Sequence, residues 1–287
     1  MLEKLYAVAG MLGNAGKDTI FKVVAGAEGG TRTTLFYGLK GSIIALLSMG
    51  ILLVEGKSLL HPASIPWAVP LGVLTFATYT FALKSLVGGD ASTSVTIFRL
   101  NFVLSTAAAA LFLGEAITVR KLSGLALSLG AMLIFFAGSR GERGAQAPRG
   151  VRVRANLLAL GACVCASLLN ITNKVALNAG VSILHLIMYR YVVVSIICAA
   201  WLAAARQSFA PTRRIAIASA SCAVLMLVSL LSTLTGLSVG EVSVVIPITS
   251  LSFLFTALLS FLFLHERLSA AKIIGIALAA ASITIIG

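Results

Sequence analysis

Residues 83–124, LKSLVGGDASTSVTIFRLNFVLSTAAAALFLGEAITVRKLSG, and residues 234–275, LTGLSVGEVSVVIPITSLSFLFTALLSFLFLHERLSAAKIIG, are two copies of one pattern. Apolar sequence matches itself by chance, but here the glycine and charged positions also agree in order. The matched residues of the first copy are Leu83, Leu86, Gly89, Asp90, Ser92, Leu100, Phe102, Phe112, Leu113, Glu115, Lys121 and Gly124, and those of the second are Leu234, Leu237, Gly240, Glu241, Ser243, Leu251, Phe253, Phe263, Leu264, Glu266, Lys272 and Gly275. The chain therefore contains an internal repeat.

The repeat extends toward the start of each copy after a slip of one residue. Lys22 matches Lys174, and Tyr37 matches Tyr189. Each copy then covers about half of the chain, so the fold has to be explained as two related halves.

The composition excludes a soluble globular protein. Of the 287 residues, 59% are hydrophobic and 11% are charged, and the mean hydropathy is +1.04. An average soluble domain is about 45–50% apolar and about 25% charged, so a soluble fold would expose large apolar patches. Ten helices of about 20 residues fill nearly the whole length. The sequence predicts a multi-pass protein of the lipid bilayer, in a cell inner (plasma) membrane.

We expect ten membrane-spanning helices joined by short, turn-rich connections. The expected spans are residues 5–25, 33–54, 66–86, 91–113, 118–138, 155–177, 183–205, 213–237, 242–264 and 270–287. A basic linker at 139–154 separates a first repeat, 1–138, from a second, 155–287. Because five is odd, the second repeat must cross the membrane in the opposite sense. The predicted fold is an all-α integral membrane protein with two inverted five-helix repeats around a central cavity.

The net charge of +13 comes from 22 Lys and Arg against 9 Asp and Glu. Loop Lys and Arg orient membrane proteins, and the sequence contains no basic-aromatic module typical of a nucleic-acid-binding protein. It also contains no residue cluster of the kind that holds a metal or performs catalysis. We therefore expect no nucleic-acid partner, no cofactor, no metal and no enzymatic activity.

The two copies of the motif resemble a known family. The similarity is carried by Gly240-Glu241-Val242-Ser243, Ile246-Pro247 and Leu264-His265-Glu266-Arg267-Leu268, and by Gly89-Asp90-Ala91-Ser92 and Leu113-Gly114-Glu115-Ala116-Ile117. These stretches are similar to the EamA type of the drug/metabolite transporter superfamily, over nearly the whole chain. The resemblance implies ten helices and export of metabolites, often amino acids. Family repeats usually carry proline early in the fourth helix; Pro247 supplies it in the second repeat, but Thr96 stands in the first, so matched kinks do not follow from the sequence.

Arg99 is the first candidate for binding a substrate. It lies in the middle of a predicted span, where a charged side chain is costly and faces a cavity or a partner. Its counterpart in the second repeat is Ser250, so the repeated scaffold does not itself require the charge. Arginine binds a carboxylate through two parallel hydrogen bonds. The alternative is a buried pair with Asp18, the one acid that lies clearly inside a predicted span.

Amide and aromatic side chains supply the other candidate substrate-binding residues, which are Asn14, Tyr79, Asn101, Asn170, Asn173 and Tyr189. The amides could bind the amino or carboxylate group of a substrate, or could join neighbouring helices by hydrogen bonds. The tyrosines could form an aromatic wall, although aromatic residues near span ends are also typical of the membrane interface.

Three acids are candidates for coupling or gating. Asp18 is the plausible proton carrier inside a span, and Glu115 and Glu266 follow the fourth and ninth spans as a repeated pair. Such a pair could latch opposite membrane faces or could simply form polar interfaces. Asp90 and Glu241 begin the same two spans, where we expect them to cap the helix N-termini.

The sequence favours a secondary transporter that exports amino acids with apolar or aromatic side chains by alternating access, as a monomer. One alternative is a phosphate-bearing substrate such as a nucleotide sugar, bound by Lys17, Lys40 and Arg190 together with Arg99. A multidrug exporter of hydrophobic cations is a weaker alternative, because it needs a central carboxylate and the predicted cavity carries surplus positive charge.

Overall fold

The computed structural model describes residues 2–28, 33–88, 91–137, 149–256 and 270–286, and all the regular elements in these ranges are helical. The first repeat contains α1 (Leu2–Glu28), α2 (Thr33–Val54), the short 3₁₀ helix η1 (Pro62–Ser64), α3 (Ile65–Gly88), α4 (Ala91–Arg99), α5 (Asn101–Leu113) and α6 (Val119–Ala137). The second contains α7 (Arg149–Asn178), α8 (Ile183–Ala204), α9 (Arg213–Val239), α10 (Val242–Ser250) and α12 (Ala270–Ile285).

Several of these helices can cross a bilayer. Within the described ranges, six segments are both long and apolar enough, and they are Thr33–Val54, Pro62–Leu86, Thr93–Leu113, Gly150–Asn178, Ile183–Ala204 and Arg213–Val239. Shorter apolar helices cover Val242–Thr256 and Ile273–Ile285. The outside of the bundle is correspondingly apolar: more than half of the surface of Leu46, Leu111, Phe112, Leu157 and Ile196 is exposed, as expected for side chains that face lipid.

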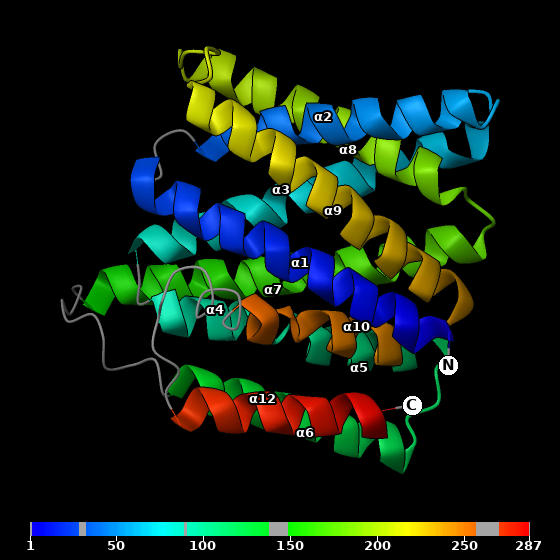
Figure 1. Cartoon of the computed structure of the whole chain (residues 1–287), viewed down its shortest axis with the longest axis vertical. Helices are drawn as coiled ribbons and strands as arrows, with labels where there is room; N and C mark the ends of the chain where they lie inside the picture. Colours follow the sequence, from blue (N-terminus) through cyan, green and yellow to red (C-terminus); the bar gives the residue numbers. More distant parts are fainter. Residues whose placement is uncertain (1, 29–32, 89–90, 138–148, 257–269, 287) are drawn as a thin grey trace.

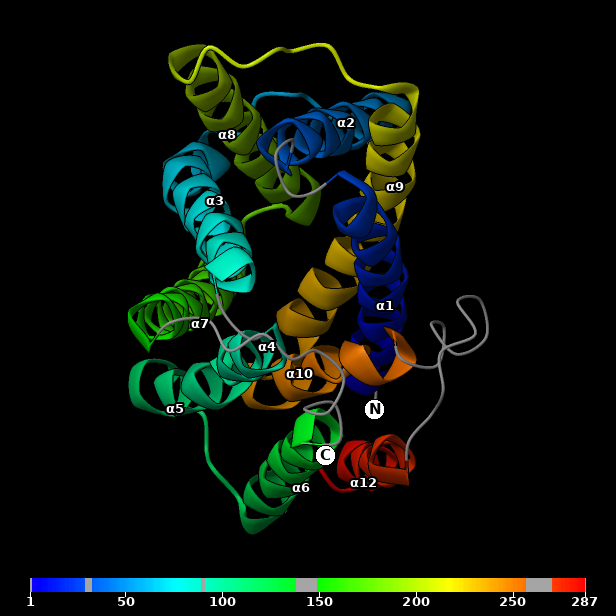
Figure 2. The same cartoon turned by 90° about the vertical axis from the view of Figure 1, so that its left-hand side faces the viewer.

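The helices pack in a pattern that is unchanged when the two repeats are exchanged. Helix α1 packs against α9 as α7 packs against α3, while α2 packs against its own counterpart α8, and α6 against α12. The α2 and α8 helices lie at one edge of the molecule and the α6–α12 pair at the opposite edge (Figures 1 and 2). This exchange symmetry confirms the two-repeat helical fold.

Equivalent helices run in opposite directions. In Figure 1, α1 begins at the right of the view and α7 begins at the left, and both chain termini lie at the right. We call the end of the bundle that holds both termini the terminal end. The main apolar core is shared between the repeats, and it includes Met11, Phe102, Leu186, Ile187 and Leu237.

The fourth span of each repeat is interrupted at the same position. In the first repeat the backbone N–H of Leu100 donates to the oxygen of Ile97 at 3.2 Å, and the oxygen of Leu100 accepts from Val103 at 3.0 Å. In the second repeat, Leu251 makes the same two bonds to residues three positions away, at 3.1 and 3.0 Å. These bonds form a short 3₁₀ turn within each span, a feature that often marks a functional hinge. At Leu100 the turn coexists with the α-helical bonds to Thr96 and from Leu104, both at 3.3 Å.

The matched interruptions do not follow the proline pattern, from which matched kinks could not be derived. Pro247 lies inside α10, whereas Thr96 occupies the equivalent position in α4, yet both spans break. Proline is therefore not what places the break in the first repeat. The break lies instead at Leu100 and Leu251, the leucine that both copies share.

A pair of equivalent glycines permits the close approach of α6 and α12. A Cβ atom added at Gly124 would lie 2.7 Å from a side-chain atom of Ile286 and 2.9 Å from its Cα, and one added at Gly275 would lie 3.1 Å from the oxygen of Ala131. Near Gly124, the hydroxyl of Ser282 donates to the Gly124 oxygen at 2.8 Å and lies 2.6 Å from the Ser128 hydroxyl.

We predict that Gly124→Leu lowers the thermal stability of the detergent-solubilised protein, because the new side chain must push α12 away from α6. The apparent unfolding temperature, followed by tryptophan fluorescence, measures the effect. Gly130→Leu is the matched control on the same helix, because an added Cβ there meets nothing within 4 Å. An equal loss of stability in both variants would contradict the role of the α6–α12 interface, because leucine has a higher helix propensity than glycine and should not by itself destabilise either position.

Candidate functional site

A cavity of about 560 Å³ lies between the two repeats. Its lining comes from each of the helices α1 to α10. Among the lining residues are Asn14, Lys17, Asp18, Tyr37, Thr78, Tyr79, Ser94, Phe98, Arg99, Asn101, Phe135, Asn170, Asn173, Arg190, Met226, Thr233, Thr249 and Phe253. The lining is thus apolar and aromatic in large part, with a limited number of polar groups, as is typical of sites for small molecules.

Two tyrosines form an aromatic wall. The rings of Tyr37 and Tyr79 stack with their centroids 4.8 Å apart, and the Tyr79 hydroxyl contacts the sulfur of Met226 at 3.9 Å. Behind the rings, the Nζ atom of Lys40 lies 4.3 Å from the Tyr37 centroid and 4.5 Å from the Tyr79 centroid. Lys40 is only 3% exposed, so these cation–π contacts stabilise a buried charge and fix the wall.

Arg99 lines the cavity, but its guanidinium is largely used by the protein. Its Nη2 atom donates to Oδ2 of Asp18 at 3.0 Å, and Lys17 lies 3.4 Å from the other oxygen of the same carboxylate. The structure therefore contains the Arg99–Asp18 pair that stood as the alternative to substrate binding. The pair still borders the cavity, with side-chain exposures of 17% and 29%.

The same guanidinium joins the two interrupted spans. Its Nη1 atom donates to the backbone oxygen of Ser250 at 3.3 Å and to the hydroxyl of Ser252 at 3.1 Å. These two residues flank the break at Leu251, and Arg99 itself precedes the break at Leu100. One side chain thus connects the hinge of the first repeat to the hinge of the second.

The predicted amides all line the cavity, and three of them also make contacts within the protein. Asn101 donates to the oxygen of Phe98 at 2.8 Å, and Asn170 donates to the hydroxyl of Ser105 at 3.0 Å. Asn173 accepts a long bond from Nη1 of Arg190 at 3.4 Å. Asn14 lies on the α1 side of the cavity. The structure thus brings Asn14, Asn101, Asn170 and Asn173 together with Tyr79, Asp18 and Arg99 around one space.

Tyr189 is not among the residues that line this cavity. Its hydroxyl donates to the oxygen of Leu59 at 2.7 Å and accepts from the backbone N–H of His61 at 3.1 Å. The side chain therefore holds the connection between α2 and η1 against α8. Tyr37 and Tyr189 occupy equivalent positions in the two repeats, but of the two only Tyr37 lines the cavity.

Arg190, the next residue, lines the cavity, although the sequence assigned it only to the alternative of a phosphate-bearing substrate. It is 2% exposed, and of its side-chain nitrogens Nη1 donates to Asn173. The sequence contained one usable signal, since the equivalent position in the first repeat is Gly38. The charge is therefore not part of the repeated scaffold.

At the terminal end, Glu115 crosses from the first repeat to cap a helix of the second. Gly114, at φ 68°, ends α5 in the left-handed conformation and turns the chain toward α10. One oxygen of the Glu115 carboxylate accepts from the N–H of Val242 at 2.7 Å, and the other accepts from the N–H and hydroxyl of Ser243 at 2.9 and 2.6 Å. A carboxylate is favourable at this helix end.

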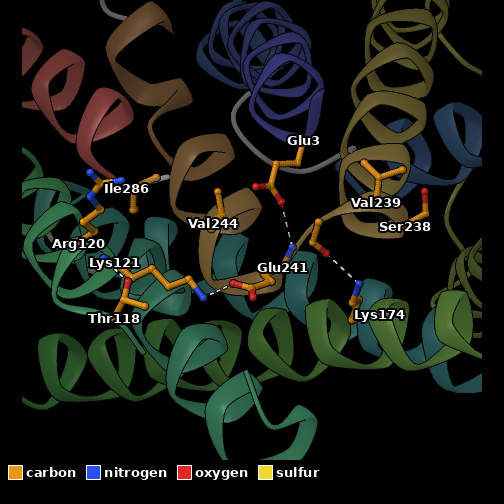
Figure 3. Close-up of a pocket in the computed structure, with 11 residues that line it drawn as sticks. Glu3, Thr118, Arg120, Lys121, Lys174, Ser238, Val239, Glu241, Val244 and Ile286 are labelled. Atoms are coloured by element: carbon orange, nitrogen blue, oxygen red, sulfur yellow. Dashed lines mark hydrogen bonds and ion pairs between the residues drawn. The ribbon is translucent and has the colours of Figure 1, made fainter. Parts of the chain in front are cut away.

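The cap expected from Glu241 itself is wrong. Glu241 holds the N-cap position of α10, but its carboxylate makes no capping bond and instead pairs with Lys121 of the first repeat (Figure 3). Its backbone N–H donates to Glu3 at 3.2 Å, and Lys174 donates to the oxygens of Leu237 and Gly240 at 2.7 and 2.8 Å. Asp90 and Glu266, the counterparts of Glu241 and Glu115, lie outside the described residues.

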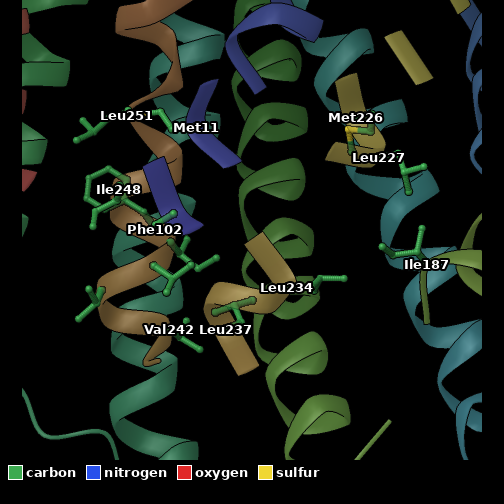
Figure 4. Close-up of a cluster of buried hydrophobic side chains, with 14 of the residues drawn as sticks. Met11, Phe102, Ile187, Met226, Leu227, Leu234, Leu237, Val242, Ile248 and Leu251 are labelled. Carbon is green, nitrogen blue, oxygen red and sulfur yellow. The ribbon is translucent and has the colours of Figure 1, made fainter. Parts of the chain in front are cut away.

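Apolar contacts from both repeats hold α10 in place (Figure 4). Met11 of α1, Phe102 of α5 and Leu237 of α9 belong to the same buried apolar cluster as Val242 and Ile248 of α10, and α10 packs against all three of these helices. Polar contacts at its first turn and apolar contacts along its length therefore tie α10 to the first repeat.

Within the described ranges, no three His, Cys, Asp or Glu side chains are placed to hold a metal ion.

Comparison with known proteins gives a family and a fold. The model of the EamA-like transporter family matches residues 4–137 and again residues 153–287. No curated protein matches the chain. Of 29 matching chains of solved structures, one, described only as the crystal structure of a protein, has a TM-score of 0.82 at 16% identity and covers 99% of this chain and 97% of its own. At this identity the likeness shows the fold alone.

We predict that Asp18→Asn and Arg99→Gln each lower the apparent unfolding temperature, because the first leaves Arg99 without a carboxylate and the second leaves Asp18 with Lys17 alone, in a largely apolar setting. The double variant should lose less than the two single losses together, with a coupling of about 0.5–3 kcal/mol. The control cycle is Glu55→Gln with Lys57→Gln, an exposed ion pair of 2.7 Å, for which the coupling should be small. Additive losses at Asp18 and Arg99 would contradict the pairing.

Proposed function

Because the chain belongs to the EamA-like transporter family, whose members are membrane transporters of small molecules, we propose that it exports amino acids with apolar or aromatic side chains. The composition of the cavity carries the proposal. Tyr37 and Tyr79 offer an aromatic surface, the asparagine amides offer donors and acceptors, and Arg99 and Arg190 add positive charge. This combination suits a small zwitterion with an apolar side chain.

The size and charge of the cavity support the same substrate class. A volume of about 560 Å³ falls within the range of about 300–1,000 Å³ that is typical of small-molecule sites. Lys17, Arg99 and Arg190 line it with Asp18 as the acid, and Lys40 lies directly behind the aromatic wall. A hydrophobic cation would meet repulsion there, because like charges repel strongly where water is scarce.

The polar contacts at the terminal end support alternating access between the repeats. In the structure, Glu115 and Lys121 of the first repeat bind the start of α10 in the second, so this end is held together by interactions between the two halves. Inverted repeats move by exchanging conformations. We propose that the Glu115 contacts break in the alternate state and that Glu266, which stands at the equivalent sequence position, then serves the opposite end.

We further propose that the protein works as a monomer in the inner (plasma) membrane, without a cofactor and without catalysis of a reaction. The cavity is formed by the helices of one chain, so a second copy is not needed to complete it. Asp18 is the cavity carboxylate that could carry a coupling proton, and its pair with Arg99 would then change as the proton binds.

Counterflow in proteoliposomes tests the substrate. Vesicles loaded with unlabelled phenylalanine, methionine or threonine should accumulate the same labelled amino acid from outside, saturably and with phenylalanine and methionine ahead of threonine, because the cavity wall is aromatic and apolar. Protein-free vesicles are the control. Accumulation of a nucleotide sugar or of a quaternary-ammonium dye, without amino-acid counterflow, would contradict the proposal and leave only the transporter family.

Side-specific accessibility tests the Glu115 contacts. Val244 is 3% exposed and lies in the first turns of α10, so Val244→Cys, in a background without the four native cysteines, reports opening of the terminal end. We expect Glu115→Gln to increase labelling of this cysteine by a water-soluble maleimide about tenfold or more, because hydrogen bonds to a charged group contribute about 1.5–3 kcal/mol.

The matched control for this variant is Glu55→Gln, which removes an exposed carboxylate in the connection after α2 and should leave labelling unchanged. If the Val244→Cys protein is labelled equally with and without the Glu115→Gln substitution, these contacts do not hold the terminal end closed.

A further inference from the structure

The cavity contains a second arginine, Arg190, whose hydrogen-bonding capacity is only partly used. Arg190 is 2% exposed, and its Nε and Nη2 atoms have no hydrogen-bond partner among the described residues. The ion pairs of the described residues do not include Arg190. A buried charge without a counter-ion is strongly unfavourable, so this side chain is suited to bind an anionic group that arrives from the cavity.

The two unused donors lie together on one edge of the guanidinium. Nε and Nη2 are fixed side by side by the planar geometry of the group, with their N–H bonds parallel. This edge matches the two oxygens of a carboxylate, which accept both bonds at once. The other donor, Nη1, points to Oδ1 of Asn173 at 3.4 Å, and this contact orients the group.

The surroundings of Arg190 leave its Nε and Nη2 atoms without an acceptor among the described residues. On one side the Tyr191 ring lies 5.3 Å from the Cζ atom of Arg190, which favours the cation without using its N–H groups. Asn173 is 5% exposed and also lines the cavity, so its amide lies beside the same space. The site is therefore built from α7 and α8, next to the aromatic wall.

The comparison with Arg99 separates the roles of the two arginines. The Nη atoms of Arg99 bind Asp18, Ser250 and Ser252, and its charge is balanced by a carboxylate. Arg190 has one long contact to a neutral amide. An incoming anion would have to displace Asp18 from Arg99, whereas at Arg190 it would meet two buried donors that no acceptor of the described residues occupies.

We propose that Arg190, oriented by Asn173, binds the carboxylate of the transported molecule, and that Arg99 is a positioning residue that connects the two hinges. This inference rests on the proposed function for the identity of the substrate as an amino acid, but the carboxylate subsite itself rests on the geometry of Arg190. The substrate's apolar side chain would then lie toward Tyr79 and Tyr37.

Arginine modification of the unaltered protein tests the subsite without a variant that has to fold. The purified protein is treated with phenylglyoxal, and modification of each arginine is followed by mass spectrometry in the presence of 3-phenylpropionate, phenethylamine, phenyl phosphate or phenylalanine. We expect 3-phenylpropionate and phenylalanine to protect Arg190, and phenethylamine to give no protection. Protection of Arg99 alone, or stronger protection of Arg190 by phenyl phosphate than by 3-phenylpropionate, would overturn the proposal.

Binding to variants gives the second measurement. Thermal stabilisation by 3-phenylpropionate should show affinity weakened about 10–100-fold in Arg190→Gln, the loss expected when a charged hydrogen bond is removed, and partly restored in Arg190→Lys. Arg214→Gln, at an exposed arginine at the start of α9, should bind as the unaltered protein does. Unchanged affinity in a folded Arg190→Gln variant would also overturn the proposal.

The two proposals fail differently. If 3-phenylpropionate binds through Arg190 but phenylalanine neither binds nor is transported, the carboxylate subsite stands and the amino-acid substrate is wrong. If phenylalanine is transported and Arg190→Gln transports it with an unchanged KM, the substrate stands and the subsite is wrong.

Discussion

The hydrogen bonds of Arg99 at the point where two broken helices meet are the interaction on which the arrangement of the bundle depends. In the second repeat the N–H of Leu254 donates to Leu251, and the oxygen of Ser250 accepts from Arg99 of the first repeat. A backbone carbonyl inside a membrane protein needs such a partner. Because Asp18 of α1 balances the charge, the guanidinium connects three helices of both repeats and fixes the walls of the cavity around their common centre.

Most of the fold followed from the sequence because the repeat is carried by residues that apolar composition does not produce by chance. Glycines and charges in matched order indicated two inverted halves, and the exchange symmetry of the helix contacts agrees with this. The breaks at Leu100 and Leu251 could not be predicted in the same way. Proline marks only one of the two spans. Next to the other break, Arg99 makes a tertiary contact with Ser252 of the second repeat, which the local sequence does not reveal.

The candidate site was predictable to the level of helices and less so to the level of individual side chains. Polar side chains in the middle of apolar spans have to face a cavity or a polar partner, so the sequence identified Asn14, Asn101 and Asn170 as candidates. All three line the cavity. Tyr189 and Arg190 show where prediction from the sequence stops, because it could not tell which of the two side chains faces the cavity. Neighbours on a helix point about 100° apart, and it is the rotation of α8 about its axis that directs Tyr189 to a connecting loop and Arg190 to the cavity. That rotation is set by packing against α2 and α3.

The charged residues of the cavity do not follow the two-fold relation between the repeats, whereas the helix packing does. Alternating access by inverted repeats needs two halves that can exchange conformations, but a small substrate has no two-fold symmetry, so its recognition has to come from residues that one repeat has and the other lacks. Arg99 corresponds to Ser250 in the second repeat, and its guanidinium is occupied by contacts within the protein, including one to the backbone oxygen of Ser250. Arg190 corresponds to Gly38, and its hydrogen bond among the described residues stays within the second repeat. The asymmetry that packing leaves unexplained therefore lies at Arg190, a cavity residue whose Nε and Nη2 atoms have no hydrogen-bond partner among the described residues.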